Sequence, residues 1–231
     1  WYNNVNWEAK MDKKVITIGR QFGSGGHEVG LRLAKSLGIP FYDKELLTLT
    51  SENSRFAESF LKKMDEQKPS FLNIGSAGVI SGAGISAATE STMNQFYHLS
   101  PNDQIFLATS KVMQDLAAKG PCVIVGRCAD YVLRDIDSID FFVVAEFADR
   151  VNRKLALEEN SNLSVQAMEK IVKNADKNRS KYYEYYSHQV WGDSKNYDLC
   201  INTSTVGVDG AVEIMLKFVE EFHKYSILPD K

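Results

Sequence analysis

A short apolar strand that runs into a glycine-rich turn and then into a helix is the feature that most constrains the fold. Residues 15–18 are apolar or β-branched, and three glycines and a serine occupy positions 23–26. The hydrophobic period then changes from two residues to about 3.6 over 29–37. Backbone N–H groups at such a turn favour an anion, as does the helix dipole. The pattern predicts a phosphate-binding loop; a turn that needs glycine only for its geometry is the alternative.

Further strand-like runs alternate with helical patterns along the chain. Short apolar runs occur at 39–42, 122–125, 139–144 and 198–202. Apolar residues recur with helical spacing over 100–119, 147–155, 164–186 and 208–222. Ser100, Pro101 and Asp103 are typical of a helix start, as N-cap, first helical residue and capping-box partner. Strands that alternate with amphipathic helices predict a three-layer α/β fold, a parallel sheet with helices on both faces.

The remaining segments divide the chain into a domain and its extensions. Residues 1–12 lack any periodic pattern and are expected to be a disordered leader. Residues 13–226 are expected to form a single domain, followed by a tail at 227–231. Within it, 52–98 is rich in small residues and is interpreted as a flexible insert. Its glycines follow no apolar strand, which argues against a second phosphate loop.

Composition excludes several classes of function. The net charge is −3, so no general positive field draws the chain to a nucleic acid polymer or an anionic membrane. No apolar run reaches the roughly 20 residues needed to cross a bilayer. The three cysteines lack CxxC spacing, which argues against structural disulfides and a zinc site. Cys122 and Cys200 lie in apolar runs and are expected to be buried. A cytoplasmic protein is the expectation.

Candidate ligand-binding residues follow the strands, because ligands of parallel sheets bind beyond the carboxyl ends of the strands. The candidates are residues 20–26, Asp43, Arg127 and 202–204. Arg127 could hold a phosphate or a base edge with its forked guanidinium, or pair with Asp130. Asp43 could orient an acceptor or a metal-bound water, or cap the helix that follows it.

Three blocks of sequence resemble the cytidylate kinase-like family. They are residues 16–30 with 39–47, residues 120–130, and residues 176–204. The resemblance covers most of 13–225 and is poorest over 52–98. It implies a P-loop nucleoside monophosphate kinase fold, with a small helical lid at 150–192 and the acceptor side at 52–98.

The family resemblance also implies a reaction and roles for residues. The reaction is transfer of the γ-phosphoryl group of ATP, with Mg²⁺, to CMP or dCMP, and the partners are small nucleotides. The implied nucleotide-binding residues are Gly23, Ser24, Gly25, Gly26, His27, Arg150 and Arg153. The implied acceptor-binding residues are Asp43 and Arg127, and the implied catalytic residues are Arg20, Asp176 and Arg179. No residue is expected to be a metal ligand, and the oligomeric state is left open. Without the resemblance, Asp176 and Arg179 would be read as a solvated ion pair.

The glycine-rich loop departs from the Walker A pattern, in which a lysine and then a hydroxyl residue follow the last glycine. Gly26 and His27 stand at those positions. Because phosphoryl transfer depends on charge stabilisation, Arg20, His27 or another cation must substitute for the lysine in a working kinase. The alternatives are a nucleotide-binding sensor or interaction protein without transfer activity, and a kinase for another small acceptor.

Overall fold

The fold is that of a computed structural model, which describes residues 15–43 and 100–226. The predictions for 1–12, 52–98 and 227–231 lie outside the described residues. The chain divides into two compact units. One comprises residues 1–43 and 117–231 and contains the sheet, and the other comprises residues 44–116.

Five parallel strands form one sheet in the order β2-β3-β1-β4-β5. The strands are β1 (Val15–Arg20), β2 (Phe41–Tyr42), β3 (Cys122–Val125), β4 (Ser138–Val144) and β5 (Leu199–Asn202). Of the central three, β3 is wholly buried and β1 and β4 are mostly buried, as expected for a parallel sheet covered on both faces. Because all five are parallel, their carboxyl ends lie along one edge. The residues that follow β1, β2 and β3 are therefore close together at that edge.

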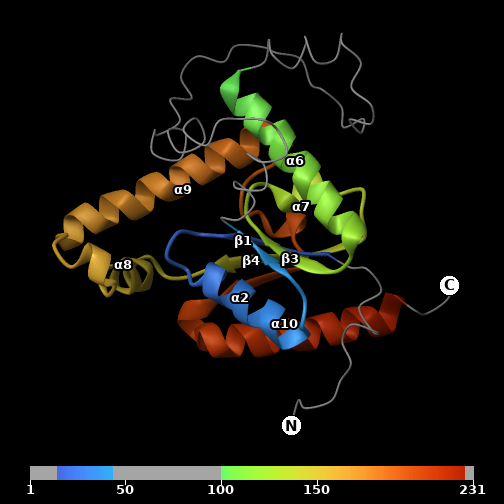
Figure 1. Ribbon diagram of the computed structural model, residues 1–231. Helices are drawn as coiled ribbons and strands as arrows, with labels where there is room; N and C mark the ends of the chain where they lie inside the picture. The colour runs from blue at the N-terminus through green and yellow to red at the C-terminus, as the bar shows by residue number, and fades with distance from the viewer. Residues whose placement is uncertain (1–14, 44–99, 227–231) are drawn as a thin grey trace. The chain divides into compact units, whose positions relative to one another are not determined.

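Helices lie on both faces of the sheet. Helices α2 (Gly26–Leu37) and α10 (Thr203–Ser226) pack together on one face, and the short α7 (Ala129–Val132) lies on the other (Figure 1). The main core lies between the sheet and α2 with α10. The predicted three-layer α/β fold is confirmed. Helix α7 was not predicted because four residues are too few to show a helical period.

Helices α8 (Phe147–Leu155) and α9 (Val165–Ser187) lie side by side beyond the end of β4 (Figure 1). Two short 3-10 turns, η2 (Glu158–Asn160) and η3 (Ser194–Asn196), precede and follow α9. A separate apolar cluster joins the two helices to the glycine-rich loop. Its members are Val151, Met168 and Val172, with Phe22, Phe147 and Leu155 packed against them. This cluster fixes the loop against the α8–α9 pair.

A local signal in the sequence is confirmed at one further point, the start of a helix. Helix α6 (Pro101–Lys119) begins as predicted, with the Asp103 amide donating to Ser100 Oγ at 3.2 Å. All three cysteines are free thiols. The prediction of a buried Cys200 is wrong, because β5 is an edge strand and Cys200 lies on the face opposite the buried Ile201.

No described helix is both long and apolar enough to cross a membrane.

Candidate phosphate-transfer site

The loop between β1 and α2 requires glycine at two positions. Gly23 and Gly25 have φ angles of 78° and 82°, in the left-handed region that favours glycine. A Cβ atom on Gly23 would lie 2.8 Å from the carbonyl oxygen of Arg150, so the loop approaches the backbone of α8 more closely than any side chain permits. The sequence of the loop thus sets its path against α8.

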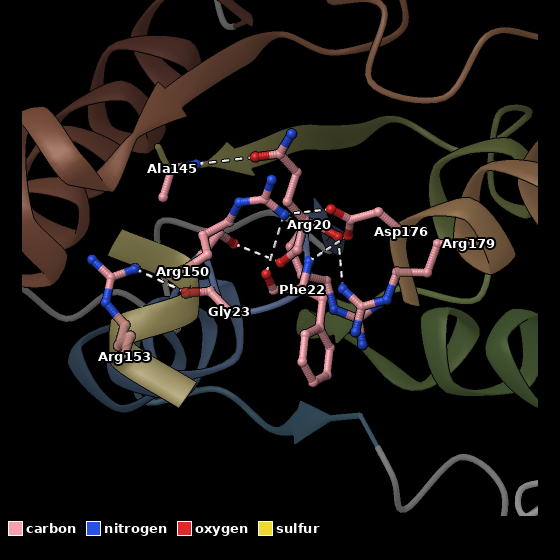
Figure 2. A network of polar contacts seen from close by, with 10 residues as sticks. Arg20, Phe22, Gly23, Ala145, Arg150, Arg153, Asp176 and Arg179 are labelled. Atoms are coloured by element: carbon pink, nitrogen blue, oxygen red, sulfur yellow. Dashed lines mark hydrogen bonds and ion pairs between the residues drawn. The ribbon is translucent and has the colours of Figure 1, made fainter. Parts of the chain in front are cut away.

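Four side chains from other elements donate hydrogen bonds to carbonyl groups at this turn, and Figure 2 shows the three that belong to arginines. The donor–acceptor pairs are Arg179 Nη1 to Arg20 O at 2.8 Å, Arg150 Nη1 to Phe22 O at 3.3 Å, Arg153 Nη1 to Gly23 O at 3.0 Å, and Thr203 Oγ1 to Ser24 O at 2.6 Å. Ser24 is itself fully buried and its hydroxyl donates to Gln21 O at 2.9 Å, so Ser24 shapes the loop from within. These bonds occupy the carbonyl groups of the turn with donors from other elements.

Five amides at the turn and the start of α2 have no acceptor among the described residues. Among the hydrogen bonds of the described residues, the N–H groups of Gly23, Gly25 and residues 26–28 donate to no group, and the N-cap residue Gly25 has no side chain to cap the helix. Buried or half-buried amides normally find a partner, so a row of unpaired N–H groups at a helix start suits an anion. The residues present therefore fit the phosphate groups of a nucleotide.

Asp176 anchors the loop to α9. One carboxylate oxygen accepts from the Phe22 amide at 2.7 Å, and the other pairs with the Arg150 guanidinium (Figure 2). Both side chains are mostly buried, at 8% exposed for Arg150 and 17% for Asp176. The ion pair between Asp176 and Arg179 that helix spacing alone suggests does not form, because Asp176 turns to Arg150 on α8. Arg150 and Arg153 both donate to carbonyl oxygens of the loop, so these donors hold the loop itself.

Three arginines at the carboxyl edge of the sheet interact electrostatically. They come from the end of β1 (Arg20), the turn after β3 (Arg127) and helix α9 (Arg179). Burial, followed by the charge of Arg20 and further helped by that of Arg127, lowers the pKa of Arg179 to about 9. Burial also lowers the pKa of Arg20, although the Asp43 carboxylate opposes the shift. Clustered cations are a suitable site for a phosphate anion.

Asp43 joins two of the predicted site residues. Its two oxygens contact Arg20 Nη2 at 3.1 Å and His27 Nδ1 at 2.7 Å. The His27 side chain is 56% exposed and its ring meets Phe41 edge-on. Whether Asp43 also caps the helix predicted after it lies outside the described residues.

The described residues fit the Mg²⁺ ion of the predicted ATP–Mg²⁺ complex less well than they fit its phosphate groups. No group of three or more His, Cys, Asp or Glu side chains among the described residues could hold an ion. His27 stands where a Walker A loop has a hydroxyl, and its imidazole offers nitrogen where Mg²⁺ prefers oxygen. The loop therefore lacks its usual Mg²⁺ ligand, and Mg²⁺ would have to be held chiefly by phosphate oxygens and water.

Two residues of the site escaped the sequence analysis as individual candidates. Thr203, only 2% exposed, fastens the loop to the start of α10, and only its place directly after β5 hinted at a role. Asp130 accepts a hydrogen bond from Tyr183 Oη at 2.7 Å and so ties α9 to the turn that carries Arg127. Nothing in the local sequence pairs two residues that are 53 positions apart.

Asp130 makes the stability of the protein depend on pH. Burial, and to a smaller extent the charge of Asp140, raises its pKa to about 6 from a usual 3.8, although the Tyr183 hydrogen bond opposes the shift. The folded state thus favours the protonated acid. The contribution of the raised pKa to the free energy of unfolding is complete below about pH 3.8 and is lost as the pH rises through 6. Asp130→Asn, which cannot ionise, is expected to raise the free energy of unfolding at pH 7 by about 2 kcal/mol.

Urea unfolding at pH 4.5 and pH 7 checks this prediction. The gain should shrink at the lower pH, and the exposed control Asp209→Asn should show no comparable change. An equal effect of Asp130→Asn at both pH values would mean that the carboxyl group does not titrate in this range.

Comparisons with known proteins show which family and which characterised relatives this chain resembles. Residues 15–205 match the Cytidylate kinase-like family. A curated cytidylate kinase from Staphylothermus marinus is 28% identical over 127 residues, which are 54% of this chain and 70% of that protein. A second one, from Desulfurococcus amylolyticus, is 27% identical over 122 residues, or 53% of this chain and 61% of that protein. The matched segment is thus less than two thirds of the second relative.

Solved structures share the fold along nearly the whole chain. A crystal structure of an uncharacterized protein from Eubacterium ventriosum has a TM-score of 0.63 at 26% identity, covering 90% of this chain and 98% of its own. A gluconokinase from Sinorhizobium meliloti has a TM-score of 0.51 at 13% identity, with 93% and 98% covered. A shikimate kinase from Bacteroides thetaiotaomicron has a TM-score of 0.50 at 10% identity, with 90% and 98% covered. The two kinases support the fold alone. The match over residues 15–205 confirms the resemblance seen in the sequence: the chain belongs to the Cytidylate kinase-like family.

Proposed function

We propose that the protein is a phosphotransferase that moves the γ-phosphoryl group of ATP, bound with Mg²⁺, to CMP or dCMP. The observation that carries the proposal is the loop of residues 21–25. Side chains of α8 and α10 donate to its carbonyls at residues 22–24, and α9 donates to the Arg20 carbonyl just before it, while the amides at the start of α2 have no acceptor among the described residues. A turn that served only to reverse the chain would not require these contacts. The arrangement therefore favours a loop that binds a polyphosphate.

Each predicted site residue then takes a role consistent with its contacts. The amides of Gly23 and residues 25–27 bind the donor phosphates, and Ser24 keeps the loop in shape. Arg150, Arg153 and Asp176 hold the loop from behind, so their effect on the nucleotide is indirect. Arg179 faces the anion site from α9, and the α8–α9 pair acts as the lid that excludes water during transfer.

The acceptor side rests on Arg127 and Asp43. Arg127 follows β3 and lies within the electrostatic influence of Arg20 and Arg179, so an anionic acceptor placed there meets three cations. Asp43 orients Arg20 and His27 toward the same edge. CMP or dCMP is proposed as the acceptor because the two curated relatives are named cytidylate kinases.

The absence of a loop lysine favours a second candidate. With Gly26 at that position, the protein could bind a nucleotide without transferring its phosphoryl group and serve as a sensor or interaction protein. Both candidates require nucleotide binding at the loop, and they differ in turnover alone.

Substitution of Gly25 tests the shared requirement. Gly25→Ala forces an L-residue into a left-handed conformation and places a Cβ 3.1 Å from Val208. It is expected to raise the Kd for ATP at least about tenfold, equivalent to about 1.4 kcal/mol. Gly38→Ala is the matched control, since its φ of 70° imposes similar strain with nothing within 4 Å.

Both variants should lose about 1 kcal/mol of stability from backbone strain, so only nucleotide binding separates them. Isothermal titration calorimetry with ATP and Mg²⁺ provides the measurement. Equal Kd values for Gly25→Ala and the wild type would contradict nucleotide binding at this loop.

A further inference from the structure

Gly26, at the position of the missing lysine, has no room for any side chain. A Cβ atom there would lie 2.6 Å from the Cβ and 3.0 Å from the Cγ of Arg20, with Val143 Cβ at 3.3 Å. Contacts under 3.0 Å between such atoms do not occur without movement of the backbone. Because the closest atom is a Cβ, any residue except glycine at position 20 would exclude a side chain at position 26.

Gly126 encloses the other end of the same arginine. Its φ is 78°, and a Cβ atom on it would lie 1.7 Å from Arg20 Nη1 and 2.6 Å from Arg20 Cζ. The arginine thus runs from the end of β1 past one glycine, and its guanidinium lies against a second glycine at the end of β3. Two glycines from separate elements leave space for one side chain, which we name the Arg20 slot (Gly26, Gly126 and Asp43).

The guanidinium in the slot keeps donors available for a ligand. Asp43 accepts from Nη2 at 3.1 Å, and that is the only bond that the Arg20 side chain donates to a described residue. The Arg20 carbonyl is held separately by Arg179. A guanidinium has five N–H donors in a planar fork, so most of them remain for an anion at the edge where Arg127 and Arg179 also gather.

We propose that Arg20 is the catalytic cation that replaces the loop lysine, and that an arginine at position 20 and a lysine at position 26 are mutually exclusive ways of supplying one charge. The inference rests on the proposed phosphotransferase function. In the reaction, the bond between the γ-phosphorus and the β–γ bridging oxygen breaks as a bond to an acceptor phosphate oxygen forms. Arg20 neither gains nor loses a proton and acts by stabilising the charge on the transferring group.

Chemical rescue tests the role of the guanidinium. Arg20→Ala removes it while keeping the Cβ, and kcat is expected to fall about a thousandfold, with a much smaller change in KM for ATP. Free guanidinium ion at millimolar concentration should enter the vacated slot and restore part of kcat, whereas sodium ion at equal ionic strength should not. Arg32→Ala, which removes an exposed arginine of α2, is the control and should show neither loss nor rescue.

A double-variant cycle tests the exclusion. Gly26→Lys alone is expected to lower Tm by about 5 °C or more, because the lysine meets Arg20. When Gly26→Lys is added to Arg20→Gly, the decrease in Tm should be much smaller. The double variant should also have a kcat at least about tenfold higher than that of Arg20→Gly alone. The Tm part of the cycle does not depend on turnover.

The outcomes separate this inference from the proposed function. A wild-type protein without turnover on any acceptor overturns both. A wild-type protein that turns over, with an Arg20→Ala variant that keeps its kcat, overturns the inference alone. A Gly26→Lys variant as stable as the wild type would likewise contradict the exclusion of a side chain at position 26.

Discussion

Replacing Arg179 with alanine is expected to lower kcat for phosphoryl transfer about a thousandfold, at the lower end of what an arginine on a transferring phosphoryl group contributes. Arg179 enters the anion site from α9, donates to the Arg20 carbonyl and lies over the Phe22 ring. Its loss removes a cation from the cluster and one of the four bonds that hold the loop carbonyls. Single-turnover measurements with saturating ATP separate the chemical step from nucleotide binding.

Arg179 should also give the reaction a distinctive pH profile. Its pKa is lowered to about 9, so the side chain is charged below that pH and becomes neutral as the pH rises through it. We therefore expect kcat/KM, which reports the free enzyme, to fall above pH 9, earlier than for an arginine with an ordinary pKa. Arg179→Lys and a Tm measurement are the controls. A thousandfold loss in an Arg179→Ala variant that has also unfolded would say nothing of catalysis, whereas a stable variant with normal kcat would contradict the assigned role.

The second large expected effect is a decrease in the free energy of unfolding when Asp176 loses its charge. Asp176→Asn keeps an oxygen for the Phe22 amide but leaves the buried Arg150 guanidinium without its counterion. Breaking one side of a buried pair costs about 3 kcal/mol, because the remaining charge is uncompensated. Arg150 already has its Nε atom buried without a partner among the described residues, which leaves little other compensation.

Urea unfolding measures this loss directly. Asp209→Asn serves as the control, since its carboxylate also pairs with an arginine but is 85% exposed, where an ion pair contributes about 0–1 kcal/mol. The double variant Asp176→Asn/Arg150→Met, which removes both charges, should recover much of the stability. Equal and small losses for Asp176→Asn and Asp209→Asn would show that the buried pair does not hold the loop.

The fold could be predicted from the sequence because its signals are local. Apolar runs predicted β1, β3 and β4, the first two of them ending at a glycine, and helical period predicted α2, α8 and α9. The cap at Ser100 marked the start of α6, and its side chain accepts the expected backbone bond. Strand β5 was located correctly, but its edge position, and with it the exposure of Cys200, depends on the order of strands. That order is a tertiary property.

The candidate site could be predicted only in part, for the same physical reason. Glycines at 23 and 25 indicated a phosphate loop because their backbone requirement is local. The partners of that loop are not local: Asp176 is 154 residues from Phe22, and Thr203 is 179 residues from Ser24. The sequence placed Asp176 beside Arg179 on one helical face, yet packing of α8 against α9 gives it Arg150 instead. The Arg20 slot likewise needs a glycine from α2 and a glycine from the turn after β3, Gly26 and Gly126, which are 100 residues apart in sequence.

A coupled phosphoryl-transfer assay tests the proposed function most directly. Wild-type protein and Arg127→Ala are supplied with ATP and Mg²⁺ and with CMP, dCMP, UMP, AMP and GMP in separate reactions, and ATP binding is followed by calorimetry. The account predicts turnover on CMP or dCMP that Arg127→Ala abolishes while ATP binding persists. Binding of ATP by the wild type without turnover on any of the five acceptors would contradict it and leave a nucleotide-binding protein without cytidylate kinase activity.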